Sequence, residues 1–389
     1  MVTTTTIAGV LSLALTISSH PPSGGGGVPA AHDHMPRSEV QRIEQLLERS
    51  AAELQAAGKL KVTPNAPKID NLQWPLRARP GYSAPEYSGV SNFVDLNAAV
   101  PNQLLDFSCG ARTYDLSNGY NHAGIDYFLW PFEWQLMDAG LIEIVAAAPG
   151  TIIAKEDGSA DRSCPNNYSA NWNAVYVQHS DATVAWYGHM KLNSLTAKPA
   201  GATVAAGEYL GLVGSSGFSS GPHLHFELRS NAQGNAQILE AHAGACRSGP
   251  SMWANQRPYF DSRVSRLATH SAPPNFNVPC PNPTQETPNF KDRFNPGEQG
   301  LFAAYYRDQR RGQLTQYRIT RPDGSVYQSW QHAPNNPQTA FYAASYWYWI
   351  YNLPQSPAGT WNFEATFEGR TERKSFLLGP DVIFANAFQ

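Results

Sequence analysis

Residues 209–229 read YLGLVGSSGFSSGPHLHFELR, two short apolar runs separated by a cluster of glycine and serine. Apolar runs with turn-forming residues between them predict antiparallel β-strands. Side chains of an extended strand alternate between its two faces, so His223 and His225 point one way while Leu224 and Phe226 point into a core. This stretch therefore predicts a β-sheet that presents two imidazoles on one face.

The same pattern continues on both sides of this stretch, in the runs IEIVAAAPGTIIA, NAVYVQHS and TVAWYGHM. Aromatic residues make up 12% of the 389 residues and charged residues only 15%, with 31 Gly and 30 Pro, a balance that favours strands and turns over helices. We therefore expect a mainly β protein whose antiparallel β-sheet domain covers residues 73–260. A net charge of −3 and a pI near 6.4 argue against nucleic acid and acidic membrane surfaces as partners.

Two further segments add metal-ligand residue types. His122 and Asp126 stand four apart in NHAGIDYF, so an extended strand turns both side chains to one side, and Gly124 between them is expected to leave room for an ion. His189 follows in AWYGHMKL. A lone H-x-H is a weak signal, but imidazoles together with one carboxylate are the ligands that zinc prefers in catalytic sites, where an open position remains for water. The sequence contains no H-E-x-x-H and no phosphate-binding glycine motif.

The order H-x-x-x-D, Gly-His-Met and Gly-Pro-His-Leu-His-Phe on a β-rich background resembles the lysostaphin/LytM-type zinc endopeptidases, over about Tyr120 to Arg229. The resemblance implies a small antiparallel β fold with a long groove over a zinc ion. It implies zinc ligands and, separately, catalytic imidazoles: His122, Asp126 and His225 as ligands, and His189 and His223 as catalytic residues. It also implies oxyanion stabilisation by a tyrosine, for which three are candidates: Tyr114, Tyr120 and Tyr187.

Other histidines and aromatic residues receive simpler expectations. His179 is expected to be structural, and His242, His270 and His332 to lie at the surface. His32 and His34 either bind metal weakly or block the zinc in a latent precursor, although their surroundings look flexible. The segment between Asp126 and Pro149 is long for the family, and its Trp130, Phe132 and Trp134 either form a groove wall or lid, or simply pack on the sheet.

The resemblance implies an enzyme that hydrolyses peptide bonds in bacterial peptidoglycan, at a stem cross-link or an interpeptide bridge. Two alternatives stay open: a non-catalytic wall-binding or hydrolase-activating protein, and an extracellular protease of broader specificity. We expect a monomer without an integral membrane segment in the mature chain, secreted or periplasmic, because the apolar run Ile7–Ile17 resembles a secretory signal, although it lacks the usual basic residues before it.

The remaining boundaries follow from composition. Residues 1–31 are expected to be a signal and flexible segment containing the run Gly24–Gly27, and residues 32–72 an amphipathic helix, from Arg37 to Leu60, with a linker. This helix is either a propeptide or a brace on the catalytic body. Proline-rich residues 261–288 are predicted to be a linker, and residues 289–389 a small β-sandwich.

Two features of these regions carry open expectations. Residues Tyr346–Trp349 of the expected sandwich either bind wall polymer or alternate between core and surface. The four cysteines form no C-x-x-C pair, and an even number in an exported chain favours two disulfides. We expect Cys109 to pair with Cys164 and Cys246 with Cys280, because each bond then closes a loop of moderate length.

Overall fold

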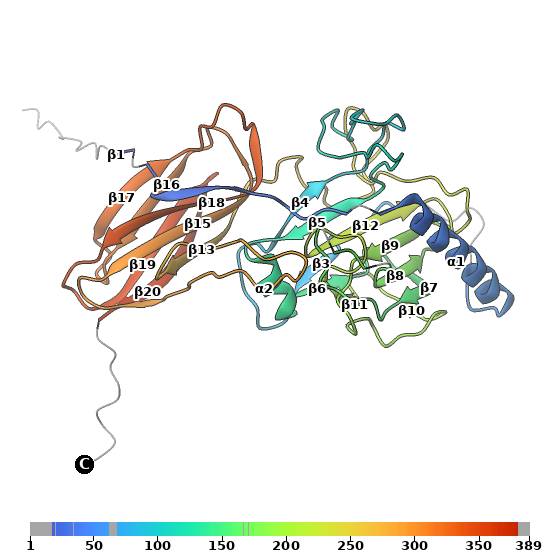
Figure 1. Cartoon of the computed structure of the whole chain (residues 1–389), viewed down its shortest axis with the longest axis horizontal. Coiled ribbons are helices and arrows are strands. Elements are labelled where there is room, and N and C mark those ends of the chain that lie inside the picture. Colours follow the sequence, from blue (N-terminus) through green and yellow to red (C-terminus); the bar gives the residue numbers. More distant parts are fainter. Residues whose placement is uncertain are drawn as a thin grey trace, which may run out of the picture.

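The computed structural model describes residues 18–19, 21–33, 35–61, 68–165, 167–169 and 171–379. Two β-rich bodies lie next to each other, with helix α1 on the outer side of the body that carries the histidine motifs (Figure 1). The fold is mostly β with antiparallel sheets and an N-terminal helix, which confirms the predicted fold class. None of the helices in the described ranges has the length and apolar character needed to cross a bilayer.

The first body contains a seven-stranded sheet of antiparallel neighbours in the order β10-β7-β8-β9-β12-β5-β4. Its strands are β4 Ser88–Asn92, β5 Ile125–Leu129, β7 Gly150–Glu156, β8 Ala174–Gln178, β9 Val184–Gly188, β10 Thr203–Val204 and β12 His223–Arg229. A second sheet contains β3 Leu76–Ala78, β6 Ile142–Val145 and β11 Tyr209–Leu212. Leu224 and Phe226 lie in the core of this body, as the alternation along the strand predicts.

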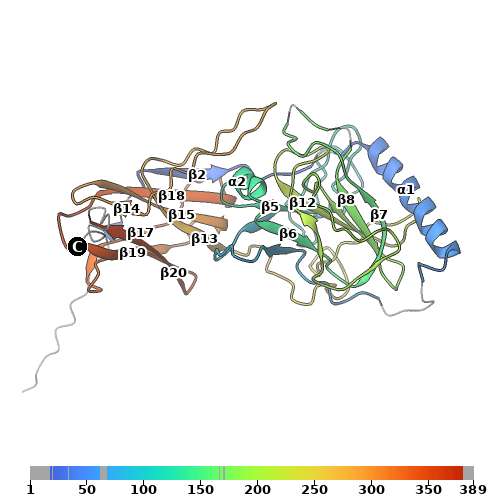
Figure 2. The same cartoon turned by 90° about the horizontal axis from the view of Figure 1, so that it is seen from below.

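Helix α1, Arg37–Ala56, covers one side of the seven-stranded sheet. Its residues Ile43, Leu47 and Ala51 are buried in one cluster with Tyr176 and Trp186 of the sheet. The apolar stripe predicted for the helix is therefore the surface through which it packs on this body (Figure 2).

The second body is a β-sandwich, as the sequence predicts. One sheet has four strands, β2 Gly24–Val28, β13 Arg263–His270, β15 Gln299–Arg310 and β18 Phe341–Asn352. The other has six strands, β1 Ser18–Ser19, β14 Arg293–Phe294, β16 Thr315–Thr320, β17 Val326–His332, β19 Gly359–Phe367 and β20 Arg370–Leu378. Trp330, Trp349 and Trp361 fill the space between the sheets. Trp349 lies in this core and Tyr346 outside it, so β18 alternates between faces.

Three strands of the sandwich, β1, β2 and β13, lie where the sequence predicts none. Strand β13 is inside the expected linker 261–288, because the prolines begin only at Pro273 and the preceding residues pair with β15. Strand β2 is inside the expected signal and flexible segment 1–31: its glycines pair with β18 and close the edge of that sheet. The apolar run Ile7–Ile17 lies outside the described residues.

The short helix α2, Glu133–Asp138, belongs to the long segment after Asp126. Its first backbone N–H groups, those of Trp134 and Gln135, donate hydrogen bonds to the carboxylate of Glu286. Phe132 stacks on Phe276, with ring centroids 5.0 Å apart. This segment therefore packs between the two bodies instead of projecting as a lid.

The predicted disulfide pairing is wrong. The bonds join Cys109 to Cys246 and Cys164 to Cys280. Distance along the chain does not decide the pairing, because the fold places the loop after Phe107 against the distant loop 244–247, where the backbone N–H of Cys246 donates to the carbonyl oxygen of Phe107.

Candidate metal centre

Four buried side chains meet on one face of the seven-stranded sheet: Asp33, His122, Asp126 and His225. One ligand atom from each lies within 4.8 Å of all the others. An oxygen of Asp126 lies 3.1 Å from Nε2 of His122, and its other oxygen lies 3.0 Å from Nδ1 of His225. The three residues that the sequence names as ligands are thus within ligand reach of one another.

The sheet register brings these residues together. His225 on β12 lies directly opposite Asp126 on β5 in an antiparallel pair, and opposite Gly188 on β9 on its other side. Directly opposed side chains on one face of a sheet have Cβ atoms only about 5 Å apart. His122 comes from the segment leading into β5, and His189 directly follows β9, so neighbouring strands bring all of these residues together except Asp33, which lies between β2 and α1.

Hydrogen bonds decide which nitrogen of each imidazole faces the centre. Nδ1 of His122 lies 2.7 Å from the carbonyl oxygen of Phe93, and Nε2 of His225 lies 3.2 Å from Oε2 of Glu227. Both nitrogens donate their proton to an oxygen, so the other nitrogen keeps a free lone pair. His122 therefore presents Nε2, and His225 presents Nδ1, to the centre.

His189 and His223 flank the same point with ring centroids 4.4 Å apart. Nδ1 of His189 donates to the carbonyl oxygen of Ser216 at 2.6 Å, and Nδ1 of His223 to that of Gly221 at 2.8 Å. Nε2 of each ring is buried and has no hydrogen-bond partner in the described structure. Burial lowers the pKa of His223 to about 4 and holds the pKa of His189 well below its usual range, so both imidazoles are neutral near pH 7.

The two carboxylates of the group differ in pKa. Burial raises the pKa of Asp33 to about 6. Burial acts on Asp126 in the same direction, but the imidazole of His122 and its hydrogen bond outweigh it and hold the pKa of Asp126 well below its usual range. Asp126 is therefore the constant anion of the centre.

The donor set fits a small divalent metal ion. Two imidazole nitrogens and a carboxylate converge within reach of one ion, and these are ligand types that zinc prefers in proteins. The space expected at Gly124 is not for the ion, however. A Cβ added there would lie 2.6 Å from Nε2 and from Cε1 of His225, so the missing side chain makes room for the ligand's ring.

The three tyrosines that the sequence analysis names as candidates for oxyanion stabilisation lie in two different places. The hydroxyl of Tyr120 donates to the carboxylate of Asp33, and Tyr114 stacks on His122 with ring centroids 4.6 Å apart. The hydroxyl of Tyr187 instead accepts the backbone N–H of Ala147 in the core, away from the candidate oxyanion position.

Asp33 is the residue that sequence reasoning missed. That reasoning considered the two histidines of H-D-H and overlooked the carboxylate between them. The backbone of His32 pairs with Ser220, whereas Asp33 is fully buried in the centre; His34 lies outside the described residues. The signal was a third potential ligand, a carboxylate between the two imidazoles, within the motif itself.

The other histidines are structural. His179 donates from Nδ1 to the carbonyl oxygen of Pro149. The surface prediction is wrong for His242 and His270, which are both buried: His242 stacks on Phe107, and His270 contacts Tyr305. His332 is half-buried beside Trp347.

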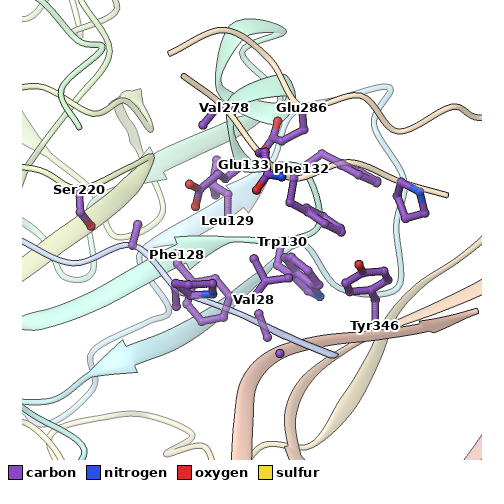
Figure 3. A pocket seen from close by; sticks show the side chains of 18 of the residues that line it. Val28, Phe128, Leu129, Trp130, Phe132, Glu133, Ser220, Val278, Glu286 and Tyr346 are labelled. Atoms are coloured by element: carbon purple, nitrogen blue, oxygen red, sulfur yellow. The ribbon is translucent and has the colours of Figure 1, made fainter. Parts of the chain in front are cut away.

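A cavity of about 700 Å³ begins beside the centre and extends between the two bodies. Residues 27–32 form one side of it, and Figure 3 shows Trp130, Phe132 and Tyr346 around it, with Glu133 and Glu286 behind them. The aromatic residues after Asp126 therefore line a cavity wall, which combines the two alternatives expected for that segment.

Residues 135–237 match the model of peptidase family M23. This confirms the resemblance drawn from the sequence motifs. The M23 match contains His189, His223 and His225, whereas His122 and Asp126 precede it.

The chain is similar over part of its length to three curated peptidases. It is 43% identical over 61 residues to the DD-carboxypeptidase/endopeptidase Mpg of Neisseria gonorrhoeae (16% of this chain, 13% of the relative). It is 32% identical over 89 residues to the peptidoglycan DD-endopeptidase ShyC of Vibrio cholerae (23% and 19%). It is 30% identical over 118 residues to the glycyl-glycine endopeptidase ALE-1 of Staphylococcus capitis (30% and 27%). The chain thus spans under a third of each relative's length.

Proposed function

We propose that this chain is a secreted or periplasmic zinc metalloendopeptidase that hydrolyses peptide bonds in bacterial peptidoglycan. One observation carries the proposal: two imidazole nitrogens and a carboxylate converge beside two further imidazoles whose inward nitrogens have no partner in the described structure. Ligands alone would suit a structural metal site. The additional pair of neutral bases suits hydrolysis.

Three residues are the proposed metal ligands, each through a particular atom. His122 through Nε2, His225 through Nδ1 and Asp126 through its carboxylate would hold the ion. Zinc, when bound, supplies a Lewis acid that polarises a carbonyl and makes water a stronger acid. Three protein ligands are the number found in catalytic zinc sites, where a position stays open.

His189 and His223 act as proton carriers in this proposal. Their Nδ1 atoms are fixed as donors to backbone carbonyls, so each Nε2 is a base aimed at the centre. A neutral Nε2 accepts the proton of the attacking water and returns it to the leaving amine. The protonated ring also stabilises the negative charge that develops on the carbonyl oxygen.

The substrate class follows from the relatives, two of which are named DD-endopeptidases and one a glycyl-glycine endopeptidase. The name of the Vibrio cholerae relative specifies peptidoglycan, and we propose peptidoglycan peptides as the target, at a stem cross-link or an interpeptide bridge. The two disulfides favour an oxidising compartment, which suits a protein acting on the wall. Wall-polymer binding by the sandwich stays a prediction.

Mass spectrometry of the muropeptides released from purified peptidoglycan tests the function and identifies the bond. The digestion uses the full chain and Asp33→Ala, because the Asp33 carboxylate lies among the ligands. We expect new amino termini at one type of peptide bond, and none with His223→Ala. His179→Ala is the matched control, since His179 is equally buried, also donates from Nδ1 to a carbonyl oxygen and also has an unpaired Nε2. Unlike His223, it is not one of the two imidazoles that flank the centre.

Each alternative function has its own result. Metal binding without any release of fragments would favour a wall-binding or activating protein. Faster cleavage of casein than of peptidoglycan would favour a general protease.

A further inference from the structure

The cavity of about 700 Å³ between the two bodies has an acidic group in its wall, the carboxyl group of Glu133. Among the described residues, this side chain forms no hydrogen bond and no ion pair. Protein surrounds it on most sides, but part of it stays accessible through the cavity. Burial, together with the neighbouring carboxylate of Glu286, raises the pKa of Glu133 well above its usual range. A cation beside Glu133 would offset the cost of its buried charge.

The second carboxylate of the cavity, that of Glu286, is already engaged. It accepts hydrogen bonds from the backbone N–H groups of Trp134 and Gln135, at 3.2 and 3.1 Å. None of the residues that line the cavity in the described ranges is a lysine or an arginine. One uncompensated carboxyl group suits a single positive charge. It offers too few oxygen atoms for Ca²⁺ or Mg²⁺, which take about six or more oxygen ligands.

Most of the residues that line the cavity are apolar, and several are aromatic. The ring of Phe276 stacks on those of Trp130 and Phe132, with centroids 5.2 and 5.0 Å apart. Figure 3 shows Trp130, Phe132 and Tyr346 on one side of Glu133. Such a lining contacts the methylene groups of a ligand and lowers the local dielectric constant. An ion pair of carboxylate and ammonium is therefore stronger in this cavity than in water.

Glu133 lies against the turn that positions His223. A Cβ added to Gly221 would lie 2.6 Å from Oε1 of Glu133, so the glycine allows the carboxyl group to approach this turn closely. The carbonyl oxygen of Gly221 accepts the hydrogen bond from Nδ1 of His223. Ser220 lines the cavity one residue earlier, and Figure 3 shows it on the side of Glu133 that faces away from the aromatic rings. A group bound at Glu133 therefore lies beside a proposed proton carrier.

The loop that forms one wall of the cavity, residues 273–278, is held in place on both sides. The disulfide between Cys164 and Cys280 joins the segment after this loop to the first body. The backbones of Asn275 and Thr287 exchange two hydrogen bonds of 2.9 Å. The cavity is therefore preformed, and a ligand that enters it does not have to order its wall.

We propose that this cavity is a substrate subsite on the His223 side of the metal centre and that it binds a primary amine of the peptide, with Glu133 as the counter-ion. The inference rests on the proposed function, because it places one part of the peptide substrate beside the catalytic residues. The amine enters as an ammonium ion, and Glu133 releases its proton to solvent when the ion pair forms. Peptides carry such an amine at the amino terminus or on a basic side chain, and both sources have the same chemistry.

Calorimetric titration of the full chain with small amines tests the subsite without hydrolysis. The probes are Nα-acetyl-lysine amide, which has a side-chain amine, and triglycine amide, which has an amino-terminal one, each beside its fully acetylated counterpart. We expect an amine to bind about ten- to a hundredfold more tightly than its acetylated counterpart, the contribution of a hydrogen bond to a charged group. The amine that binds more tightly identifies the source, side chain or amino terminus.

Glu133→Gln removes the charge and keeps the shape of the side chain, so we expect an unchanged circular dichroism spectrum. Its binding of both amines should fall to the level of the acetylated probes. Glu53→Gln is the control and should bind as wild type does, because Glu53 is exposed on α1 and does not line the cavity. Equal binding of each amine and its acetylated counterpart by wild type would overturn the proposal. Undiminished amine binding by Glu133→Gln would overturn it as well.

Hydrolysis then tests whether the subsite serves the substrate. Purified peptidoglycan with free amino groups is digested before and after acetylation of these groups. Wild type and Glu53→Gln should show a KM about ten- to a hundredfold lower for the untreated polymer, whereas Glu133→Gln should show similar KM values for both. Equal KM values for both polymers in wild type would overturn the assignment as a substrate subsite. If no variant releases muropeptides, the proposed function fails, but calorimetry still decides whether Glu133 binds an amine.

Discussion

Glu227 accepts a hydrogen bond from Nε2 of His225 at 3.2 Å, and this contact turns Nδ1 of His225 to the metal centre. Both residues stand on β12, two positions apart, and therefore on one face of the sheet. The other oxygen of Glu227 pairs with Arg229, which pairs in turn with Glu44 of α1. A chain of charges thus connects the N-terminal helix to a proposed ligand.

Replacing Glu227 should weaken metal binding without removing a ligand. In Glu227→Gln the carboxylate no longer fixes the tautomer of His225, and such partners typically contribute ten- to a hundredfold in metal affinity. Competition with a chelator measures the change. Glu240→Gln is the control, because Glu240 pairs with buried His242 at 2.7 Å, outside the four-residue group. Equal affinities of the two variants would show that the Glu227 contact does not support the site.

Gly124→Ala should displace a ligand by steric contact alone. The added Cβ would meet the ring of His225 at 2.6 Å and the carbonyl oxygen of Phe226 at 2.8 Å, so the imidazole has to move away from Asp126. We expect loss of metal retention together with a stability cost of roughly 1–3 kcal/mol from overpacking. Metal content after gel filtration and thermal unfolding measure the two effects. Gly234→Ala, whose added Cβ would come no closer than 3.9 Å to Oε2 of Glu48, controls for removal of a glycine as such. Full metal content in Gly124→Ala would refute the steric argument.

The contact between the two bodies depends on a buried ion pair, Arg112 with Asp308, at relative side-chain exposures of 2% and 5%. Asp308→Ala leaves the guanidinium buried without its carboxylate, and this loss costs about 3–5 kcal/mol in comparable pairs. Denaturant unfolding of the full chain measures it. The surface pair Lys374–Asp292 is the control, because Lys374→Ala should cost less than about 1 kcal/mol. Similar costs for both variants would contradict a structural role for the buried pair.

His270 should make the sandwich less stable in acid. Burial lowers the pKa of His270 to about 4, while Nδ1 donates to the carbonyl oxygen of Pro288 and Nε2 lies 2.9 Å from the hydroxyl of Tyr305. Between pH 6.5 and 4 the unfolded chain binds the extra proton, so stability falls as pH falls through this range. The stabilisation is complete above pH 6.5 and amounts to roughly 2–4 kcal/mol.

The measurement compares wild type with His270→Gln, which keeps a donor but does not titrate. From pH 6.5 to 4 the free energy of unfolding of wild type should fall by more than that of the variant. The nearby charged residues Arg266, Asp292 and Lys374 are common to both proteins, so their effects cancel in the comparison. A constant difference across this range would rule out the proposed titration.

Some elements of the fold can be predicted from short stretches of sequence. The amphipathic stripe of α1, the alternation of β12 and the sandwich strands depend on neighbouring residues in the chain, and the structure follows them. The disulfides and strand β13 instead depend on residues that are distant in the chain. Pairing of Cys109 with Cys246 depends on where two distant loops lie, and Arg263–His270 is a strand because β15 lies beside it.

The sequence by itself determined the residue types of the centre and the strands that carry them, because period-two alternation fixes which side chains share a face. Only the tertiary structure decided the ring nitrogens of His122 and His225, since these depend on Phe93 and Glu227 across the fold. Only the tertiary structure placed Asp33 in the metal centre. The glycine run that precedes Asp33 looks flexible in isolation, but it becomes a strand because β18 supplies its hydrogen-bond partners.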